Sequence, residues 1–445
     1  MMSIKKKLYI ETYGCQMNFS DSEIVASVMT GHAYDLAGSA EEADIIFLNT
    51  CSIRDHAEQR VLNRLRELQH LRKKRPGLIL GVIGCMAERL KEKLLEDEDL
   101  GMRVDMVAGP DAYRQLPQLL ADVEEGQKAI NVILSADETY ADITPVRYAD
   151  NRVSAFISIM RGCENFCAYC VVPFTRGKER SRDPASILQE TRQLLHAGYK
   201  EVTLLGQNVN SYRWHDDGGL KDFSALIGMV AAEDPDLRVR FATSHPKDMS
   251  DDLLHQMAAY PNICRAIHLP VQSGSSAVLG RMNRKYTRED YLGRVEAIRR
   301  ILPDCAISTD IIAGFCGETE EEHQATISLM KEVGFDFAFM FKYSERPDTL
   351  AARRYADDVD ETIKTRRLTE IIDLQQKLSL QSNKRDVGTM QNVLVEGASK
   401  RSDKNMMGRT SHNKVVVFPG DGYRPGDYAE VKVADCTSAT LRGAI

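Results

Sequence analysis

Long apolar runs are missing from this sequence of 445 residues. No stretch approaches the roughly 18 to 20 apolar residues that span a bilayer, which argues against a helical membrane protein. The start, MMSIKKKLYIETYGC, has lysines but only a three-residue apolar stretch, so it lacks the apolar core of a signal peptide. We therefore expect a soluble protein of the cytoplasm with no membrane partner.

An excess of positive charge is also missing. The formal net charge is −7, which argues against a general coat for nucleic acid but leaves room for a local basic module. Hydrophobic residues make up 43% and charged residues 28%, as in ordinary globular proteins. The length allows about two to four domains.

Ten cysteines are present and need an explanation. In a chain without an export signal a disulfide framework is not expected, because reducing compartments keep thiols free. The cysteines are therefore candidates for metal ligands, nucleophiles or core residues.

The first part of the chain predicts an α/β domain with an open parallel βα sheet, because short apolar runs alternate with amphipathic stretches as far as about residue 125. Cys15, Cys51 and Cys85 each follow one of its first three strand-like runs. Loops beyond the carboxyl ends of parallel strands meet at one edge, where such folds bind ligands. We expect the three thiols to meet there, although each taken alone also fits a small buried side chain.

Two further domains follow a polar segment, 137–151, that contains Pro145 and predicts a linker. Six strand-like runs then alternate with helical patterns: AFISIM, VTLLG, RVRFAT, AIHLPV, AISTDIIAGF and FDFAFMF. They predict a partial (βα)6 barrel, with its chemistry at the C-terminal strand ends. Alternating strands in the tail predict a small all-β barrel. The predicted division is 1–136, 137–151, 152–381 and 382–445.

The loop after the first barrel strand, RGCENFCAYC, has the spacing C-x-x-x-C-x-x-C, with Cys163, Cys167 and Cys170. Three thiolates at this spacing can ligate three irons of a cubane cluster and leave the fourth iron without a protein ligand. A structural zinc site is the alternative, but zinc usually takes four ligands from paired knuckles, and no second knuckle lies nearby in the sequence. In this context the loop resembles that of the radical S-adenosylmethionine (SAM) superfamily.

Other motifs run in collinear order with this loop: ETYGCQMN, LNTCSIRDHAEQ, IGCMAER, LLGQNVNSY, TSHP, HLPVQSGS and MNRKYT. With them, essentially the whole chain resembles the radical SAM methylthiotransferases, and its tail resembles their TRAM domain. NTCSIRDHAEQR and MMGRTSHNKVVVF are most similar to the members that act on tRNA. The resemblance implies methylthiolation at C2 of an N6-isopentenylated adenosine beside the anticodon, with a tRNA anticodon stem-loop as partner.

The resemblance also implies two [4Fe-4S] clusters, S-adenosylmethionine and an external electron donor. Cys163, Cys167 and Cys170 would hold the cluster that cleaves SAM to a 5′-deoxyadenosyl radical. Cys15, Cys51 and Cys85 would hold a second cluster that carries or donates sulfur, which a separate SAM molecule methylates. SAM is then both methyl donor and radical precursor.

Contacts to the cofactor are predicted at the mouth of the barrel. The candidates are Tyr169, Gly206, Gln207, Ser244, Gln272 and Asp310. Ordinary capping and hydrogen bonding at strand ends explain the last five equally well, and shielding from solvent is the alternative for Tyr169, which we expect against the adenine. A structural role is expected for His245 and His268, and a place in the core for Cys264, Cys305, Cys316 and Cys436.

The tail is the candidate RNA-binding region, since residues 382–445 hold ten Lys and Arg against seven Asp and Glu. The predicted phosphate contacts are Lys400, Arg401, Lys404, Arg409 and Lys414. On the barrel rim we expect the path to continue through Arg176, Lys178, Arg180, Arg284 and Lys285. A solvated surface would show the same pattern. The substrate base must also leave its stack to be modified.

Other functions remain open on the sequence. The same two clusters would serve methylthiolation of a threonylcarbamoylated adenosine in tRNA or of an aspartate in a ribosomal protein. A non-catalytic RNA-binding iron–sulfur protein is a further alternative. Against it, an electron relay normally caps every iron with a protein ligand, whereas both sites here leave one iron open.

Overall fold

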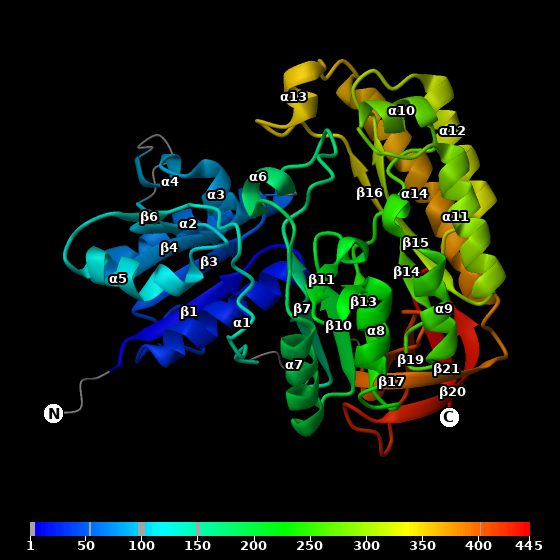
Figure 1. Cartoon of the computed structure of the whole chain (residues 1–445), viewed down its shortest axis with the longest axis horizontal. Coiled ribbons are helices and arrows are strands. Elements are labelled where there is room, and N and C mark those ends of the chain that lie inside the picture. The colour runs from blue at the N-terminus through cyan, green and yellow to red at the C-terminus, as the bar shows by residue number, and fades with distance from the viewer. Residues whose placement is uncertain (1–4, 53–54, 97–102, 148–151, 401) are drawn as a thin grey trace. The chain divides into compact units, whose positions relative to one another are not determined.

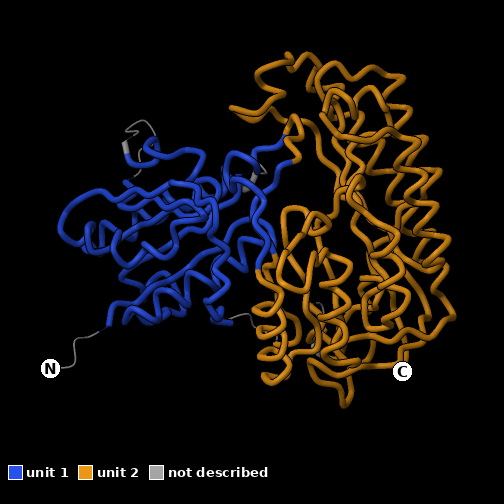
Figure 2. Tube along the Cα trace, viewed as in Figure 1, with its two compact units in different colours: residues 1–148, 160–164, 170–182 blue, residues 149–159, 165–169, 183–445 orange. Residues whose placement is uncertain are grey.

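The structure, a computed structural model, describes residues 5–52, 55–96, 103–147, 152–400 and 402–445. Ile53 and Arg54 of the NTCSIRDHAEQR motif, positions 148–151 of the predicted linker, and Arg401 lie outside the described residues. The chain folds into two compact units (Figure 2). Unit 1 contains residues 1–148, 160–164 and 170–182, and unit 2 contains residues 149–159, 165–169 and 183–445.

Unit 1 is built on a six-stranded sheet with the order β2-β1-β3-β4-β5-β6, in which all neighbours are parallel. Its strands are β1 (Lys7–Thr12), β2 (Asp35–Leu36), β3 (Ile45–Thr50), β4 (Ile79–Gly84), β5 (Met106–Ala108) and β6 (Ala129–Asn131). Its main helices are α1 (Gln16–Gly31), α2 (Asp55–Lys74), α3 (Cys85–Leu90), α4 (Lys93–Glu96) and α5 (Leu116–Glu124). The predicted parallel βα sheet is confirmed, and the short strands β2 and β6 are additions to it.

Both faces of this sheet are covered by helices (Figure 1). All six residues of β3 are buried. Ile45 and Phe47 pack with side chains of α1 and α5, whereas Ile46 and Leu48 pack with side chains of α2 and α3. A parallel sheet covered in this way gives near-continuous apolar runs in the sequence. Functional side chains are therefore left to the strand ends.

The described part of the predicted linker, residues 137–147, packs on unit 1. Tyr140 is buried and stacks on Tyr113, with ring centroids 5.6 Å apart. Its hydroxyl donates to the carbonyl of Pro110 at 3.0 Å, and Glu138 pairs with Arg114 at 2.6 Å. Within the predicted linker, this one buried aromatic side chain attaches the segment to the core of unit 1.

A later stretch of chain returns to unit 1 and adds β8 (Met160–Arg161), α6 (Val172–Arg176) and β9 (Arg180–Ser181). Strands β8 and β9 pair in antiparallel fashion. This stretch brings Arg161 and Arg176 into unit 1.

Unit 2 contains the six predicted barrel strands, in two parallel sheets ordered β13-β10-β7 and β14-β15-β16. A parallel bridge pairs Val239 of β13 with Ile263, which lies shortly before β14. The strands are β7 (Ser154–Ser158), β10 (Glu201–Leu205), β13 (Arg238–Ala242), β14 (Ala266–His268), β15 (Ala306–Ala313) and β16 (Phe337–Lys342), and a hairpin of β11 (Arg213–Asp216) and β12 (Gly219–Asp222) follows β10. The predicted partial barrel is confirmed.

Helices of unit 2 connect these strands. They are α7 (Pro184–His196), α8 (Phe223–Ala231), α9 (Asp251–Ala259), α10 (Ser276–Arg281), α11 (Arg288–Ile301), α12 (Glu320–Val333), α13 (Leu350–Arg354) and α14 (Glu361–Lys384). In Figure 1 the long helices α11, α12 and α14 run side by side along the sheet formed by β14, β15 and β16.

The tail forms a closed barrel with the order β17-β18-β19-β21-β20. Its strands are β17 (Met390–Ser399), β18 (Ser402–Arg409), β19 (Val415–Pro419), β20 (Tyr428–Cys436) and β21 (Leu441–Ala444). Arg238 and Arg240 of β13 fix it in place by donating to the carbonyls of Arg409, at 2.6 Å, and Thr410, at 2.8 Å. The predicted small all-β barrel is confirmed.

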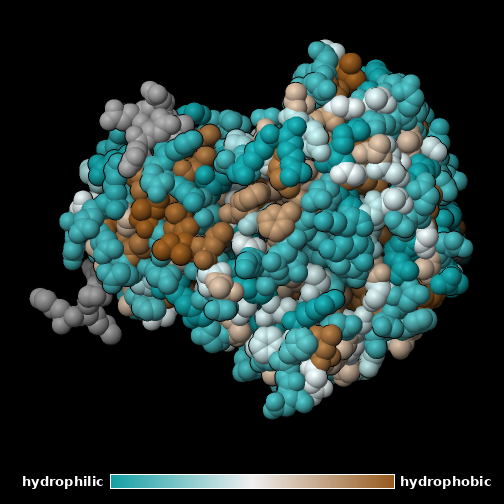
Figure 3. Space-filling model, turned by 45° about the horizontal axis from the view of Figure 1, so that its top comes forward, coloured by the Kyte–Doolittle hydropathy of each residue, from teal (hydrophilic) through white to brown (hydrophobic). Residues whose placement is uncertain are grey.

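On the face shown in Figure 3 the surface is mainly hydrophilic, with smaller apolar areas. Among the described residues, Ile133 is the most exposed large apolar side chain, at 78%. None of the described helices combines the length and the apolar character needed to cross a membrane.

Candidate functional site

Cys15, Cys51 and Cys85 lie at the carboxyl edge of three adjacent strands of unit 1. Cys15 precedes α1, Cys51 directly follows β3, and Cys85 is the first residue of α3 after β4. The register pairs Thr12 with Asn49 and Thr50 with Gly84, so the three strands end at one level. Sγ of Cys15 donates to Oδ1 of Asn18 at 3.3 Å, and a Cβ atom on the preceding Gly14 would lie 2.6 Å from Cβ of Cys51. The structure thus brings together the three thiols that the sequence singled out.

A buried amide network fixes this edge. The Asn18 side-chain nitrogen donates to Oδ1 of Asn49 at 3.2 Å and to the carbonyl of Thr50 at 3.1 Å. The Asn49 amide donates back to the carbonyl of Asn18 at 2.8 Å. The Thr50 hydroxyl donates to the carbonyl of Ile83 at 2.7 Å. Each contact joins two of the chain segments that bear a cysteine, so the thiols are held by their neighbours even before a ligand binds.

Two glycines allow the chain segments that bear the three cysteines to lie this close together. Gly14 and Gly84, directly before Cys15 and Cys85, have φ angles of +141° and +90°. A Cβ atom on Gly84 would lie 2.5 Å from Oδ1 of Asn49, and one on Gly14 would lie 2.6 Å from Cβ of Cys51. Only glycine fits both the backbone conformation and the space.

Arg176 supplies a positive charge next to these sulfurs. Its Nε donates to Sγ of Cys85 at 3.2 Å and its Nη2 to Asp21 at 2.7 Å, and Asp21 also accepts from Arg161 at 2.8 Å. Burial opposes ionisation of Asp21, but the two arginines outweigh it and hold the pKa of this carboxyl below its usual value. Nη1 of Arg176 is buried and has no hydrogen-bond partner.

The surroundings shift the pKa values of Cys15 and Cys85 in opposite directions. The hydrogen bond with Cys51 lowers the pKa of Cys15 to about 6, and the guanidinium of Arg176 acts in the same direction. Burial raises the pKa of Cys85, against the effect of Arg176. Three sulfurs at one edge, with a buried cation that has an unused N–H group, fit an anionic cluster held by thiolates.

Three of the arginines expected on an RNA-binding rim are buried instead. Arg176 is 3% exposed, and Arg180 and Arg284 are each 6% exposed. Arg180 pairs with Asp111 at 3.0 Å. These guanidinium groups satisfy carboxylates and sulfurs inside the fold, a use that a count of basic residues does not distinguish from phosphate binding. Of the five rim residues, Lys178 and Lys285 are exposed.

The C-x-x-x-C-x-x-C loop is divided between the two units, and two of its cysteines form contacts within their own unit. In unit 1, the amide of Cys163 donates to the carbonyl of Gly177 at 3.1 Å. In unit 2, Cys167 is buried, and Nη1 of Arg284 lies 3.3 Å from its Sγ. Cys170 belongs to unit 1 and is partly buried.

Polar atoms without partners gather where SAM contacts were predicted. Gly206 and Gln207 directly follow β10, and Ser244 lies just beyond β13, the neighbouring strand. Oε1 of Gln207 and Oγ of Ser244 are buried without a hydrogen-bond partner, as are Oδ1 of Asn210 and Nε2 of His245. A buried polar atom without a partner is unfavourable. Four of them near two adjacent strand ends fit a polar ligand such as SAM.

Asn210 and His245 were not predicted as contacts. Nδ1 of His245 accepts from the amide of Lys247 at 3.3 Å, which leaves the proton on Nε2, the unpartnered atom. The signal available in the sequence was their place in the motifs LLGQNVNSY and TSHP, beyond β10 and β13.

The remaining predicted SAM contacts also lie in unit 2. Gln272 is buried and has a φ angle of +72°, an unusual backbone conformation for a residue other than glycine. Asp310, in β15, is half-buried, with Oδ1 3.4 Å from Nε2 of His268. Tyr169 packs against the buried cluster that includes Phe315 and Tyr343.

The predicted RNA contacts of the tail differ in their surroundings. Lys400 and Lys404 are exposed. Arg409 pairs with Glu396 at 3.0 Å, and Lys414 pairs with Asp386 at 2.6 Å. Lys400 also lines a cavity of about 660 Å³ in the tail barrel.

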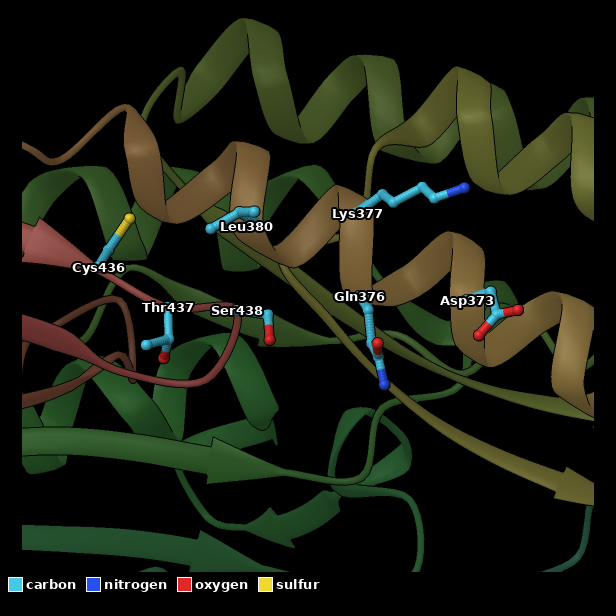
Figure 4. Close-up of a pocket in the computed structure, with 7 residues that line it drawn as sticks. All are labelled: Asp373, Gln376, Lys377, Leu380, Cys436, Thr437 and Ser438. Atoms are coloured by element: carbon cyan, nitrogen blue, oxygen red, sulfur yellow. The ribbon is translucent and has the colours of Figure 1, made fainter.

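Among the described residues, four cysteines form no hydrogen bond given by the structure with the six proposed cluster ligands: Cys264, Cys305, Cys316 and Cys436. Cys264 and Cys316 are buried. Cys436 lines a cavity of about 560 Å³ between α14 and the turn that follows β20, with Lys377 and Thr437 among the other lining residues (Figure 4).

Comparison with protein families gives three matches along the chain. Residues 7–109 match "Uncharacterized protein family UPF0004", residues 157–330 match the radical SAM superfamily, and residues 384–445 match the TRAM domain.

Curated relatives extend over the whole chain. A tRNA-2-methylthio-N(6)-dimethylallyladenosine synthase of Phocaeicola vulgatus is 58% identical over 442 residues, which are 99% of this chain and 96% of that protein. The protein of the same name from Amoebophilus asiaticus is 56% identical over 455 residues, with 100% of this chain and 93% of that protein covered. That from Porphyromonas gingivalis is 56% identical over 444 residues, with 99% and 95% covered.

Among solved structures, the fold is similar to that of the radical SAM methyltransferase TsrM of Kitasatospora setae with cobalamin and a [4Fe-4S] cluster bound. The TM-score is 0.55 at 14% identity, with 78% of this chain and 77% of that chain covered. The cobalamin-dependent radical SAM enzyme OxsB has a TM-score of 0.53 at 11% identity, with 84% and 61% covered.

Proposed function

This chain belongs to the tRNA-2-methylthio-N(6)-dimethylallyladenosine synthases, which are transferases of the radical SAM superfamily, and we propose that its substrate is the anticodon stem-loop of a tRNA. The chain uses SAM and [4Fe-4S] clusters in a radical methylthiolation. The atom modified in our proposal is C2 of an N6-isopentenylated adenosine next to the anticodon.

We assign one cluster to Cys163, Cys167 and Cys170 and the other to Cys15, Cys51 and Cys85. The observation that supports the second site most strongly is the level ending of β1, β3 and β4, with a cysteine after each strand and Arg176 beside Cys85. We further propose a methylthiotransferase domain at 1–136, a connecting segment at 137–151, a radical SAM domain at 152–381 and an RNA-binding domain at 382–445.

When bound, the clusters and SAM would supply the electron, the radical precursor, the methyl group and the sulfur. The protein's own contribution is placement and charge. Asn18, Asn49 and Thr50 hold the N-terminal thiols in position, and Arg176 balances their negative charge. Gln207 and Ser244 present polar atoms that a bound SAM can satisfy, as do Asn210 and His245.

In this proposal the tail barrel binds the RNA. Its exposed lysines, Lys400 and Lys404, are suited to phosphate contacts because neither is among the residues that form ion pairs in the described part of the tail. An external one-electron donor must reduce the cluster that cleaves SAM. Both clusters need thiols that stay reduced, which fits a reducing compartment such as the cytoplasm.

The test is anaerobic reconstitution, iron counting and turnover with SAM and reductant on tRNA with and without the isopentenyl group. We expect about eight irons per chain, from two four-iron clusters, and a 2-methylthio product only on the prenylated tRNA. The Cys15→Ala, Cys51→Ala, Cys85→Ala triple variant should keep about four irons and still cleave SAM to 5′-deoxyadenosine.

Each other outcome contradicts one part of the proposal. About four irons in the parent protein would remove the second cluster. About eight irons without a product on prenylated tRNA would redirect the search to a threonylcarbamoylated adenosine or a ribosomal-protein aspartate. Product on unprenylated tRNA would remove the isopentenyl group from the recognition.

A further inference from the structure

Arg284 lies between α10 and α11 and is held on three sides. Its Nε donates to the hydroxyl of Tyr286 at 2.9 Å, and its Nη2 donates to the carbonyl of Pro270 at 2.7 Å. The hydroxyl of Tyr286 in turn donates to the carbonyl of Val271 at 2.9 Å. These contacts leave Nη1 directed at Sγ of Cys167, 3.3 Å away. The position of the guanidinium is therefore set by the backbone around it and not by the sulfur alone.

This cation lacks the partner that a buried arginine normally has. Arg284 is 6% exposed. No carboxylate of the described residues forms an ion pair with it, and its hydrogen bonds go to a carbonyl, a phenol and a thiol. A buried charge is costly unless it is paired. The chemistry that would compensate it is an anion at Cys167: a thiolate, and the cluster that the thiolate ligates.

We propose that Arg284 is a positioning residue for the cluster on Cys163, Cys167 and Cys170, which it holds through the Cys167 sulfur and whose reduction potential it raises. The inference rests on the proposed function, because it takes that cluster assignment as its premise. Hydrogen bonds to cluster sulfurs and nearby positive charge both favour the more negative, reduced state. Arg284 stays protonated throughout, and the single electron comes from the external reductant.

Arg176 and Cys85 show the same relation in unit 1, with Nε 3.2 Å from Sγ. Each proposed cluster thus has one ligand sulfur that accepts a hydrogen bond from a buried arginine. The two arginines differ in one respect: Arg176 also pairs with Asp21, whereas Arg284 has no carboxylate partner among the described residues. The effect on potential should therefore be larger at Cys167.

The experiment uses the full chain with Cys15→Ala, Cys51→Ala and Cys85→Ala, so that the reconstituted protein holds only the cluster in question. The midpoint potential is measured by a redox titration followed by electron paramagnetic resonance. Arg284→Met, which keeps the length but removes charge and donors, should lower the equilibrium constant for reduction at least tenfold, or about 59 mV for one electron. Arg284→Lys, which keeps the charge, should shift it less.

The matched control is Arg281→Met. Arg281, on α10, pairs with Glu322 at 2.7 Å and contacts no sulfur, so its removal should leave the potential unchanged. If Arg284→Met does not retain iron, Arg284→Lys and Tyr286→Phe decide, since each disturbs the guanidinium and should shift the potential in the same direction. An unchanged potential with about four irons bound would overturn the inference. A parent triple variant that binds no iron would instead overturn the cluster assignment.

Discussion

Nε of Arg176 lies 3.2 Å from Sγ of Cys85, although the two residues are far apart in the sequence. Arg176 ends α6, shortly after the cysteine loop, and Cys85 begins α3. The stretch of chain that follows the cysteine loop therefore takes part in building the N-terminal group of cysteines. The second cluster site of our proposal is therefore built from the N-terminal segment together with residues of α6.

Replacing Arg176 tests this contribution. Arg176→Met removes the donor to Cys85 and leaves Asp21 with one arginine, so we expect the N-terminal cluster to be lost and iron to fall from about eight to about four per chain. Formation of 5′-deoxyadenosine from SAM should persist while the methylthio product disappears. Arg161→Met is the control, because it removes the other arginine that pairs with Asp21 and touches no sulfur. Equal iron loss in both variants would show that the ion pair, and not the sulfur contact, matters.

Gly84 offers a steric test of the same edge. At a φ angle of +90°, an alanine Cβ would lie 2.5 Å from Oδ1 of Asn49 and 2.8 Å from the carbonyl of Thr50. Gly84→Ala should lower the free energy of unfolding on the order of 1–3 kcal/mol and prevent the N-terminal cluster from forming. Urea unfolding and iron analysis measure both effects. Gly31→Ala, where no atom lies within 4 Å of the added carbon, should behave like the parent protein.

Glu88 should make stability depend on pH. Burial raises the pKa of this carboxyl from 4.5 to about 7, so between these values the folded state holds a proton that the unfolded chain has lost. The free energy of unfolding of the apoprotein should therefore fall as the pH rises from about 4.5 through 7. Glu88→Gln cannot ionise, so it should be more stable than the parent at pH 8 and similar to it near pH 4.5.

Urea unfolding at the two pH values measures this effect of Glu88. The same substitution at the exposed residue Glu41 serves as the control. If the parent and Glu88→Gln lost stability equally over this range, the assignment of the slope to Glu88 would be wrong.

Much of the fold could be predicted from the sequence because it depends on local patterns. The apolar runs that became β3, β4 and β5 are nearly continuous, as a sheet buried on both faces requires. The placement of Cys15, Cys51 and Cys85 followed from one rule, that parallel strands end at a common edge. The same rule placed Gln207 and Ser244 at the barrel mouth.

What the sequence did not indicate depends on tertiary contacts. Arg176 and Arg284 were expected to bind phosphate, since a basic residue in a loop gives no sign of its partner until distant segments meet. Within the predicted linker, the stacking of the buried Tyr140 on Tyr113 was not expected, because a polar segment does not indicate which of its residues packs on a core. Asn210 and His245 were missed as candidate contacts because an unsatisfied polar atom is visible only when its surroundings are known.

The exposed lysines of the tail are expected to affect RNA binding, whereas the ion-paired Lys414 is expected to affect stability. Lys400 and Lys404 are exposed, so Lys400→Ala with Lys404→Ala should weaken binding of an anticodon stem-loop and reduce the slope of log K against log salt by about two, one for each phosphate contact. Lys414 pairs with Asp386 and donates to Ser382 at the end of α14. Lys414→Ala should therefore lower the unfolding temperature and leave the salt slope unchanged.

Fluorescence anisotropy with a labelled stem-loop at several KCl concentrations measures the slopes, and thermal unfolding gives the stability. A slope that drops for Lys414→Ala and not for the double variant would mean that the RNA follows the junction between the tail barrel and α14. It would not then follow the turn between β17 and β18. Because Lys414 lies near α14 whereas Lys400 and Lys404 lie at β17 and β18, the comparison locates the RNA path on the tail with either result.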